Sequence, residues 1–90
     1  MSNVLAIINH FSLSVEQFEK LTTQQMDILC YIYEFDSISP MEAFYDLGIT
    51  KLSTRISEMR NMGISFDQNF ENNTNRYGKN VRYMRYRKAA

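Results

Sequence analysis

The sequence predicts a mainly α-helical chain that closes with a small β-hairpin, and two observations support this fold class. Apolar residues recur at helical spacing in successive segments between residues 3 and 62. After Gly63 the period changes, and apolar and polar residues alternate as they do in a half-buried strand. Ninety residues, of which 44% are hydrophobic, are enough for one domain with a small core.

The segment between Gly48 and Gly63 is the one around which the rest of the chain is arranged. It predicts a single helix over residues 50–62, with Thr50 as its N-cap and Gly63 as the left-handed residue that ends it. One stripe of this helix is apolar and should face a core: Ile49, Leu52, Ile56 and Met59. The opposite face carries Thr50, Thr54, Ser57 and Asn61, flanked by Lys51, Glu58 and Arg60.

Short hydroxyl and amide side chains on this outer face let the helix lie close against another molecule, whereas a purely solvated helix usually carries Glu and Lys. Residues 39–47 predict another short helix just before it, so that a turn containing Gly48 joins the two. This is the helix-turn-helix arrangement, in which the second helix enters the DNA major groove. The alternative is that the outer face is an ordinary solvated surface.

Capping residues mark the starts of the earlier helices. We expect these helices at residues 3–13, 15–21 and 23–35. The expected N-caps are Ser14, Thr22 or Thr23, and Ser39, with Gln17 and Glu42 completing capping boxes and Pro40 at a first helical position. The residues expected to face the core are Val4, Ile7, Ile8, Phe11, Met26, Ile28, Leu29, Cys30, Ile32, Tyr33, Ile38, Ala43, Phe44 and Leu47.

A hairpin follows the last helix. Residues 71–80 are rich in turn formers and predict a polar loop, and residues 81–87 return as a second strand. The apolar side chains expected inside are Ile64, Phe66 and Phe70 on the first strand and Met84 and Tyr86 on the second, although the pattern alone leaves the buried face of the second strand open.

A hairpin directly after a recognition helix is the wing of a winged helix. The sequence therefore predicts a winged helix-turn-helix domain over residues 22–88, with a three-helix core plus the wing. Residues 1–21 form an N-terminal helical extension that packs on the domain, pairs with a second subunit or holds a separate partner.

The charge of the chain is zero overall but strongly polarised. Residues 1–50 contain seven acidic residues and one basic residue, whereas residues 51–90 contain nine basic and three acidic residues. Binding to nucleic acid depends on local basic contacts more than on total charge, so the second half is compatible with DNA. The alternative is that the two halves attract one another within the fold.

Few residues in the sequence could take part in catalysis or metal binding. Cys30 and His10 are the only cysteine and histidine, and Cys30 has apolar neighbours, so we expect neither a metal site nor a His-dependent catalytic pair. We also find no phosphate-binding loop or paired acids, and we expect no cofactor and no enzyme activity. The apolar start of the chain lacks a basic leader and is too short to span a bilayer, which predicts a soluble cytoplasmic protein.

Residues 22–88 resemble a family of small helix-turn-helix domains common in phages and prophages. The resemblance rests on three features taken together. They are the spacing of Gly48, Arg55-Ile56 and Gly63 along the sequence, the Tyr77-Gly78-Lys79 turn, and the Arg85-Tyr86-Arg87 strand. The resemblance implies a DNA-binding regulator whose recognition helix falls on residues 50–62 and whose wing falls on residues 65–87, both facing DNA.

Our first hypothesis is a sequence-specific duplex-DNA-binding protein, a phage or prophage transcriptional regulator. Residues 50–62 would dock in the major groove while the loop at residues 71–80 grips the adjacent backbone. A single small domain makes few base contacts, so we expect a homodimer formed through residues 3–21. The predicted DNA-binding residues are Thr50, Lys51, Ser53, Thr54, Ser57, Arg60 and Asn61 on the helix and Arg76, Lys79 and Arg82 on the wing.

The alternative hypothesis is a protein-interaction module, such as a phage inhibitor of a host defence complex. It is motivated by the zero net charge, the unexplained N-terminal extension and Glu58, which would repel phosphate unless it accepts from a cytosine amino group. Arg55 lies beside the apolar stripe and could pair with Asp46 or Asp36 instead of DNA. The interleaved cations and aromatics of residues 82–88 also suit single-stranded nucleic acid, or an edge strand protected from aggregation.

Overall fold

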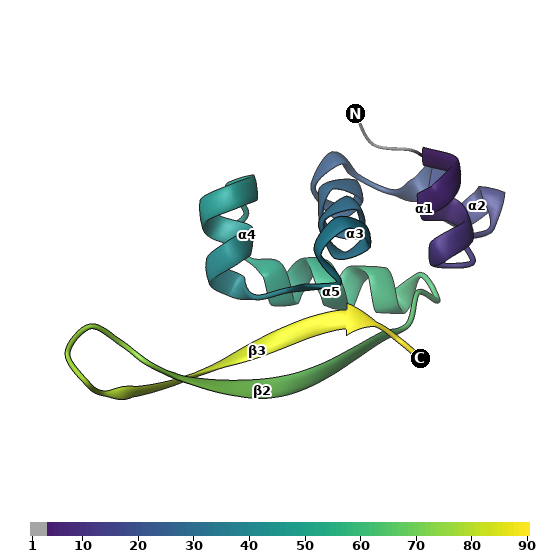
Figure 1. The fold of residues 1–90 in the computed structure, drawn as a ribbon. Coiled ribbons are helices and arrows are strands. Elements are labelled where there is room, and N and C mark those ends of the chain that lie inside the picture. The colour runs from purple at the N-terminus through teal and green to yellow at the C-terminus, as the bar shows by residue number, and fades with distance from the viewer. Residues whose placement is uncertain (1–3) are drawn as a thin grey trace.

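The computed structural model describes residues 4–90, which form five helices and a three-stranded antiparallel sheet (Figure 1). The helices lie above a long hairpin whose turn extends past them at one end (Figure 1). The elements are α1 (Val4–His10), α2 (Val15–Lys20), α3 (Thr23–Phe35), β1 (Ser37–Ile38), α4 (Pro40–Leu47), α5 (Leu52–Asn61), β2 (Phe66–Thr74) and β3 (Asn80–Lys88).

Three of the predicted N-caps are confirmed. The side chains of Ser14, Thr22 and Ser39 each accept a hydrogen bond from the backbone three residues on. Gln17 and Glu42 close two of the capping boxes as expected, and Gln25, which was not predicted, closes that of Thr22. Thr22, not Thr23, is the cap of α3. Asp36 ends α3 in a left-handed conformation, with its backbone N–H donating to the Ile32 carbonyl.

The prediction that Thr50 caps the recognition helix is wrong. Helix α5 begins at Leu52, and its N-cap is Lys51, whose side chain makes no capping hydrogen bond. The reason lies in the preceding turn, where the backbone N–H of Ile49 donates to the Ala43 carbonyl at 3.0 Å and the Ile49 side chain is buried. These contacts hold Thr50 outside the helix. At the other end, Gly63 has the predicted left-handed conformation, with φ +94°.

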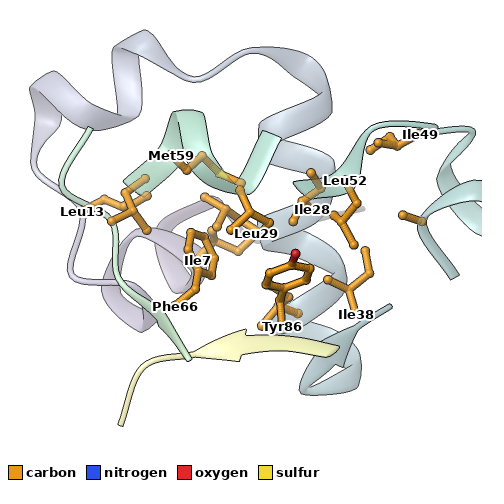
Figure 2. Packing of buried hydrophobic residues seen from close by; sticks show 14 residues of the cluster. Ile7, Leu13, Ile28, Leu29, Ile38, Ile49, Leu52, Met59, Phe66 and Tyr86 are labelled. Carbon is orange, nitrogen blue, oxygen red and sulfur yellow. The ribbon is translucent and has the colours of Figure 1, made fainter. Parts of the chain in front are cut away.

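One hydrophobic core joins the helices to the sheet (Figure 2). Figure 2 shows the ring of Tyr86 rising from β3 into this cluster, between the helices and the strand. The predicted stripe of α5 is confirmed, since all four of its residues are buried. The buried cluster comprises Ile7, Leu13, Ile28, Leu29, Ile32, Ile38, Ala43, Ile49, Leu52, Ile56, Met59, Ile64, Phe66 and Tyr86.

Several residues predicted to lie in the core are exposed instead. On α4, Ala43 is fully buried between the helices, so the next residue, Phe44, is turned outward and is 52% exposed. On α3, burial centres on Ile28, Leu29 and Ile32, which leaves Tyr33 exposed. Val4 is exposed at the start of α1.

The hairpin is longer than predicted. Residues 71–74 and Asn80, which we expected in the loop, are paired strand residues, and only residues 75–79 form the turn. Side-chain pairs explain the extension, because Glu71 lies opposite Tyr83 and accepts its hydroxyl hydrogen bond at 2.9 Å. Phe70, predicted inside, is 53% exposed. Tyr86 is buried as favoured, and Met84 is half-buried.

The sheet contains a strand that the sequence did not predict. Residues Ser37 and Ile38 form β1, which pairs with β3 opposite Arg87 and Tyr86, giving the strand order β1-β3-β2. Two residues are too short for an alternating pattern to be visible. This short strand ties the connection between α3 and α4 to the hairpin.

The N-terminal helices share the core of the rest of the chain. Ile7 and Leu13 are buried in the common cluster, and Ile8 and Phe11 pack against it. The side-chain amide of Gln17 donates to the Met62 carbonyl at 2.9 Å, which ties α2 to the end of α5. Residues 1–3 of the predicted extension lie outside the described residues.

Candidate nucleic-acid interface

The outward face of α5 is open to solvent. Its three buried residues, Leu52, Ile56 and Met59, occupy one side, and the hydroxyl side chains of Ser53, Thr54 and Ser57 are exposed on the other. The N-terminal helices reach only its C-terminal end, where Asn61 and Met62 border a small cleft with α2. All ten residues predicted to contact DNA are exposed.

The start of α5 presents positively charged and hydrogen-bond-donating groups to solvent. Lys51 is exposed at the N-cap, and no side chain caps the backbone N–H groups that follow it. Backbone N–H groups and the helix dipole make such a helix start favourable for a phosphate oxygen. Thr50 lies in the turn just before the helix, where its exposed side chain adjoins Lys51.

The turn of the hairpin presents two cations on a well-defined backbone. The Asn75 side chain accepts from the backbone N–H groups of Tyr77 and Lys79 at 2.9 and 3.1 Å, and Gly78 has φ +77°. Asn75 therefore forms the turn, and Arg76 and Lys79 project from it into solvent. Tyr77, at the tip, is 79% exposed and was not among the predicted DNA-binding residues.

Arg82 is held flat against a neighbouring ring. Its guanidinium carbon lies 3.7 Å from the centroid of the Phe70 ring, which is a cation–π contact between the two strands of the hairpin. The sequence missed this pair because it placed Phe70 in the core. The alternation of the two strands could have found it, since Phe70 and Arg82 occupy diagonal positions on one face of the hairpin.

The comparison with known families agrees with this geometry. Residues 23–88 match the model of a winged helix-turn-helix domain, which covers most of the chain. The chain belongs to this family. No significant match was found among curated proteins or solved structures. In the winged helix-turn-helix domain, α4 and α5 are the helix-turn-helix pair and β2–β3 is the wing.

Within the winged helix, Glu58 is directed toward the body. Its carboxylate accepts a hydrogen bond from the Gln25 side-chain amide of α3 at 3.1 Å and pairs with Arg55 at 3.3 Å. The predicted partners of Arg55, Asp46 and Asp36, are therefore wrong. Because the charge of Arg55 offsets that of Glu58, the Glu58 carboxylate does not prevent a DNA phosphate from approaching α5.

Two arginines of the domain have structural partners. Arg60 donates to the Phe66 carbonyl at 3.1 Å and so links α5 to β2, although the residue remains exposed. Arg85 donates to Glu71 at 2.8 Å and to Glu42 at 2.9 Å, with only 15% of its side chain exposed. Arg85 thus joins the wing to α4. Burial lowers the pKa of Arg85, but the interaction with Tyr83 and the carboxylates of Glu42 and Glu71 outweigh burial, so the pKa is raised.

The described residues offer neither a metal-binding cluster nor a membrane-spanning helix. Within residues 4–90, no group of three or more His, Cys, Asp or Glu side chains is arranged to hold a metal ion. In the same residues no helix is long and apolar enough to cross a membrane. The open face of α5 and the cationic turn of the wing remain the strongest candidate site.

Proposed function

We propose that this winged helix-turn-helix protein binds duplex DNA sequence-specifically and serves as a phage or prophage transcriptional regulator in the cytoplasm of a host cell. The family membership supports DNA binding, and the resemblance to phage domains supports the setting. The single observation that carries the proposal is the open hydroxyl-lined face of α5 beside unpaired cations.

Helix α5 is the element proposed for the major groove. Its exposed Ser53, Thr54 and Ser57 are short enough to let the helix approach the base edges, where hydroxyl groups donate to or accept from bases and phosphates. Lys51 at the helix start reaches guanine or a backbone oxygen. Arg60 and Asn61, near the end of the helix, take phosphates at the groove edge.

The wing is the element proposed for the adjacent backbone. Arg76 and Lys79 project from the turn, and Arg82 lies on the face of the hairpin against Phe70. None of these three side chains forms an ion pair within residues 4–90, so their charges are available to phosphate. Contacts of this kind fix the register of the protein without reading sequence.

A homodimer on a repeated or palindromic site remains part of the proposal, because one small domain offers few base contacts. The candidate surface is the N-terminal extension at residues 3–21, of which Asn3 lies outside the described residues. Ile7 is already used in the core, so the dimer would use the outer side of α1 and α2, where Leu5 and Val15 are exposed.

The test combines selection from random duplex oligonucleotides with a double variant, Lys51→Ala with Arg76→Ala. The selected duplex should bind the double variant at least tenfold more weakly. The slope of log affinity against log salt should flatten by about two units, because two phosphate contacts are lost. The control is Lys88→Ala, which removes an exposed lysine that is neither a proposed DNA contact nor part of the proposed dimer surface and should change neither quantity.

Unchanged affinity and salt slope in the double variant would remove Lys51 and Arg76 from the site. Failure to select any duplex at low salt would contradict DNA binding itself. Glu58 does not favour the alternative of a protein inhibitor, because its carboxylate is paired within the domain.

A further inference from the structure

A cleft between α3 and α4 lies outside the surface proposed for DNA. It is formed by residues 27–35 of α3 and the end of α4, and its volume is about 470 Å³. The lining residues are Asp27, Cys30, Tyr31, Glu34, Phe35, Asp46 and Leu47. The cleft therefore combines three carboxylates with aromatic and apolar walls.

Within residues 4–90, the carboxylates of the cleft form no ion pair. No Lys, Arg or His occurs between Leu21 and Thr50. The ion pairs of residues 4–90 use Glu16, Glu42, Glu58 and Glu71, and none uses Asp27, Glu34 or Asp46. Three unpaired negative charges around one cleft create a field that attracts a cation.

Asp46 is held in place by a neutral donor. The Tyr31 hydroxyl donates to its Oδ2 atom at 2.6 Å. Burial and this hydrogen bond raise the pKa of Tyr31 to about 12, so the tyrosine stays protonated and leaves the carboxylate charge intact. The bond fixes Asp46 at the rim of the cleft.

The apolar wall of the cleft is exposed at Phe35. Its side chain is 61% exposed, and its ring lies 4.7 Å from that of Tyr31. A ring exposed beside unpaired acids can stack on an arginine guanidinium or pack against an aliphatic side chain. Exposed aromatics are also enriched in protein–protein interfaces.

We propose that the cleft between α3 and α4 binds a cationic segment of a second protein, one that carries Lys or Arg beside a large apolar side chain. The three carboxylates hold the cations, and Phe35 with Tyr31 receives the apolar group. Nucleic acid is excluded as the occupant, since its phosphates would meet the same three negative charges. The proposal does not depend on DNA binding.

A second copy of this chain is the competing occupant, because its own wing tip carries Arg76, Tyr77 and Lys79. A wing placed in the cleft of a neighbour would make a head-to-tail contact, and such contacts generate rings or open filaments. A cationic segment of a different protein would neutralise the same three carboxylates without forming rings or filaments. Self-association is therefore an outcome of the test.

The test begins with a random peptide library displayed on phage and selected on the full chain. We expect the enriched peptides to share at least two Lys or Arg residues flanking a large apolar residue. A synthetic peptide with the enriched sequence should bind more weakly as salt rises. Glu34→Lys and Asp27→Lys should each weaken its binding at least tenfold, and Phe35→Ala should weaken it at constant salt slope.

The matched control is Glu19→Lys, an equal charge reversal on exposed α2, which should leave peptide affinity unchanged. Thermal melting followed by circular dichroism confirms that each variant is folded. The proposal is overturned if the enriched peptides share no Lys or Arg, or if the enriched peptide binds Glu34→Lys as tightly as it binds the unmodified protein. It is also overturned if selection on the unmodified protein enriches no peptide beyond those enriched by selection on Glu34→Lys. Light scattering that shows self-association abolished by Glu34→Lys would assign the cleft to a second copy and overturn it as well.

Discussion

Glu71 is the residue at which the two strands of the wing are joined by side chains. It accepts hydrogen bonds from the Tyr83 hydroxyl at 2.9 Å and from Arg85 at 2.8 Å. The Tyr83 hydrogen bond, opposed by desolvation and assisted by Arg85, holds the pKa of Glu71 below its ordinary value. Arg85 continues the network to Ser37 and Glu42.

This shift predicts how stability depends on pH. Because the folded pKa of Glu71 is lower than the unfolded pKa, its ionised form stabilises the fold above the unfolded value of 4.5. The contribution is lost as the pH falls through the folded value. We expect Glu71→Gln to be less stable at neutral pH and to show a shallower acid decline, measured by urea unfolding across the acid range.

Glu16→Gln is the control for that series, since Glu16 is exposed and pairs only with Lys20. It should keep the acid decline of the unmodified protein. An identical pH dependence in Glu71→Gln would show that the hydrogen bonds to Glu71 add nothing to the free energy of unfolding.

Phe70 gives a second prediction at the residue scale, and it rests on the proposed DNA binding. Phe70→Ala leaves the charge of Arg82 in place but removes the ring that orients it. An exposed cation–π contact is worth about 0.5–1 kcal/mol, so duplex affinity should fall about two- to fivefold. Fluorescence anisotropy on the selected duplex measures this.

Phe70→Tyr keeps an aromatic ring beneath the guanidinium and should restore the affinity. The salt slope should be unchanged in Phe70→Ala and should flatten in Arg82→Ala, because only the second variant loses a charge. Equal affinities of Phe70→Ala and the unmodified protein would mean that the ring does not position Arg82 for DNA.

At the scale of the element, α5 is fixed by its C-terminal end. The backbone N–H of Ile64 donates to the Met59 carbonyl at 3.0 Å and that of Gly63 donates to Arg60 at 2.9 Å. This is the Schellman arrangement, which requires a left-handed residue at Gly63. The same end receives the amide of Gln17, so the helix stop also anchors the extension.

Gly63→Ala should therefore destabilise the protein by more than backbone strain alone. A Cβ at this position would lie 3.0 Å from Nε2 of Gln17, which must shift from the Met62 carbonyl. The left-handed conformation adds about 1–2 kcal/mol of strain for an L-residue. Urea unfolding of the variant gives the total loss in free energy of unfolding.

Gly78→Ala is the matched control, since Gly78 is also left-handed and has open space where a Cβ would lie. The difference between the two variants isolates the Gln17 contact. Equal losses would show that this contact does not stabilise the fold.

At the scale of the whole molecule, the N-terminal helices and the winged helix share one core. Ile7 is fully buried among residues of the other elements, yet the match to the family begins at Thr23. A chain of this size has only a small core, so the side chains contributed by α1 and the following turn are a large fraction of it. This packing covers the end of α5 and leaves its polar face open.

Ile7→Ala should cost about 2–5 kcal/mol of unfolding free energy, the usual range for truncating a buried isoleucine. Leu5→Ala, on the same helix but 66% exposed, should change stability by no more than about 0.5 kcal/mol. Denaturant unfolding followed by circular dichroism measures both variants. A small loss in Ile7→Ala would mean that the extension folds independently of the rest of the chain.

The sequence determined the parts of this structure that depend on near neighbours. Ser14, Thr22 and Ser39 cap helices through groups three residues away, and Gly63 ends α5 through its own backbone freedom. The helical period also separated the buried stripe of α5 from its exposed polar face, so the exposure of the seven DNA contacts proposed at this helix followed from it. Their contact with DNA stays a prediction.

The tertiary structure decided the strand pairing, side-chain partners and burial that depend on contacts between segments distant in the sequence. Strand β1 exists because β3 returns beside it, and Glu58 turns inward because Gln25, 33 residues earlier, meets it. Phe44 and Phe70 have core-like positions in their local patterns but are exposed, because no element covers them. Local patterns fix which side chains share a face, whereas burial is fixed only when another part of the chain covers that face.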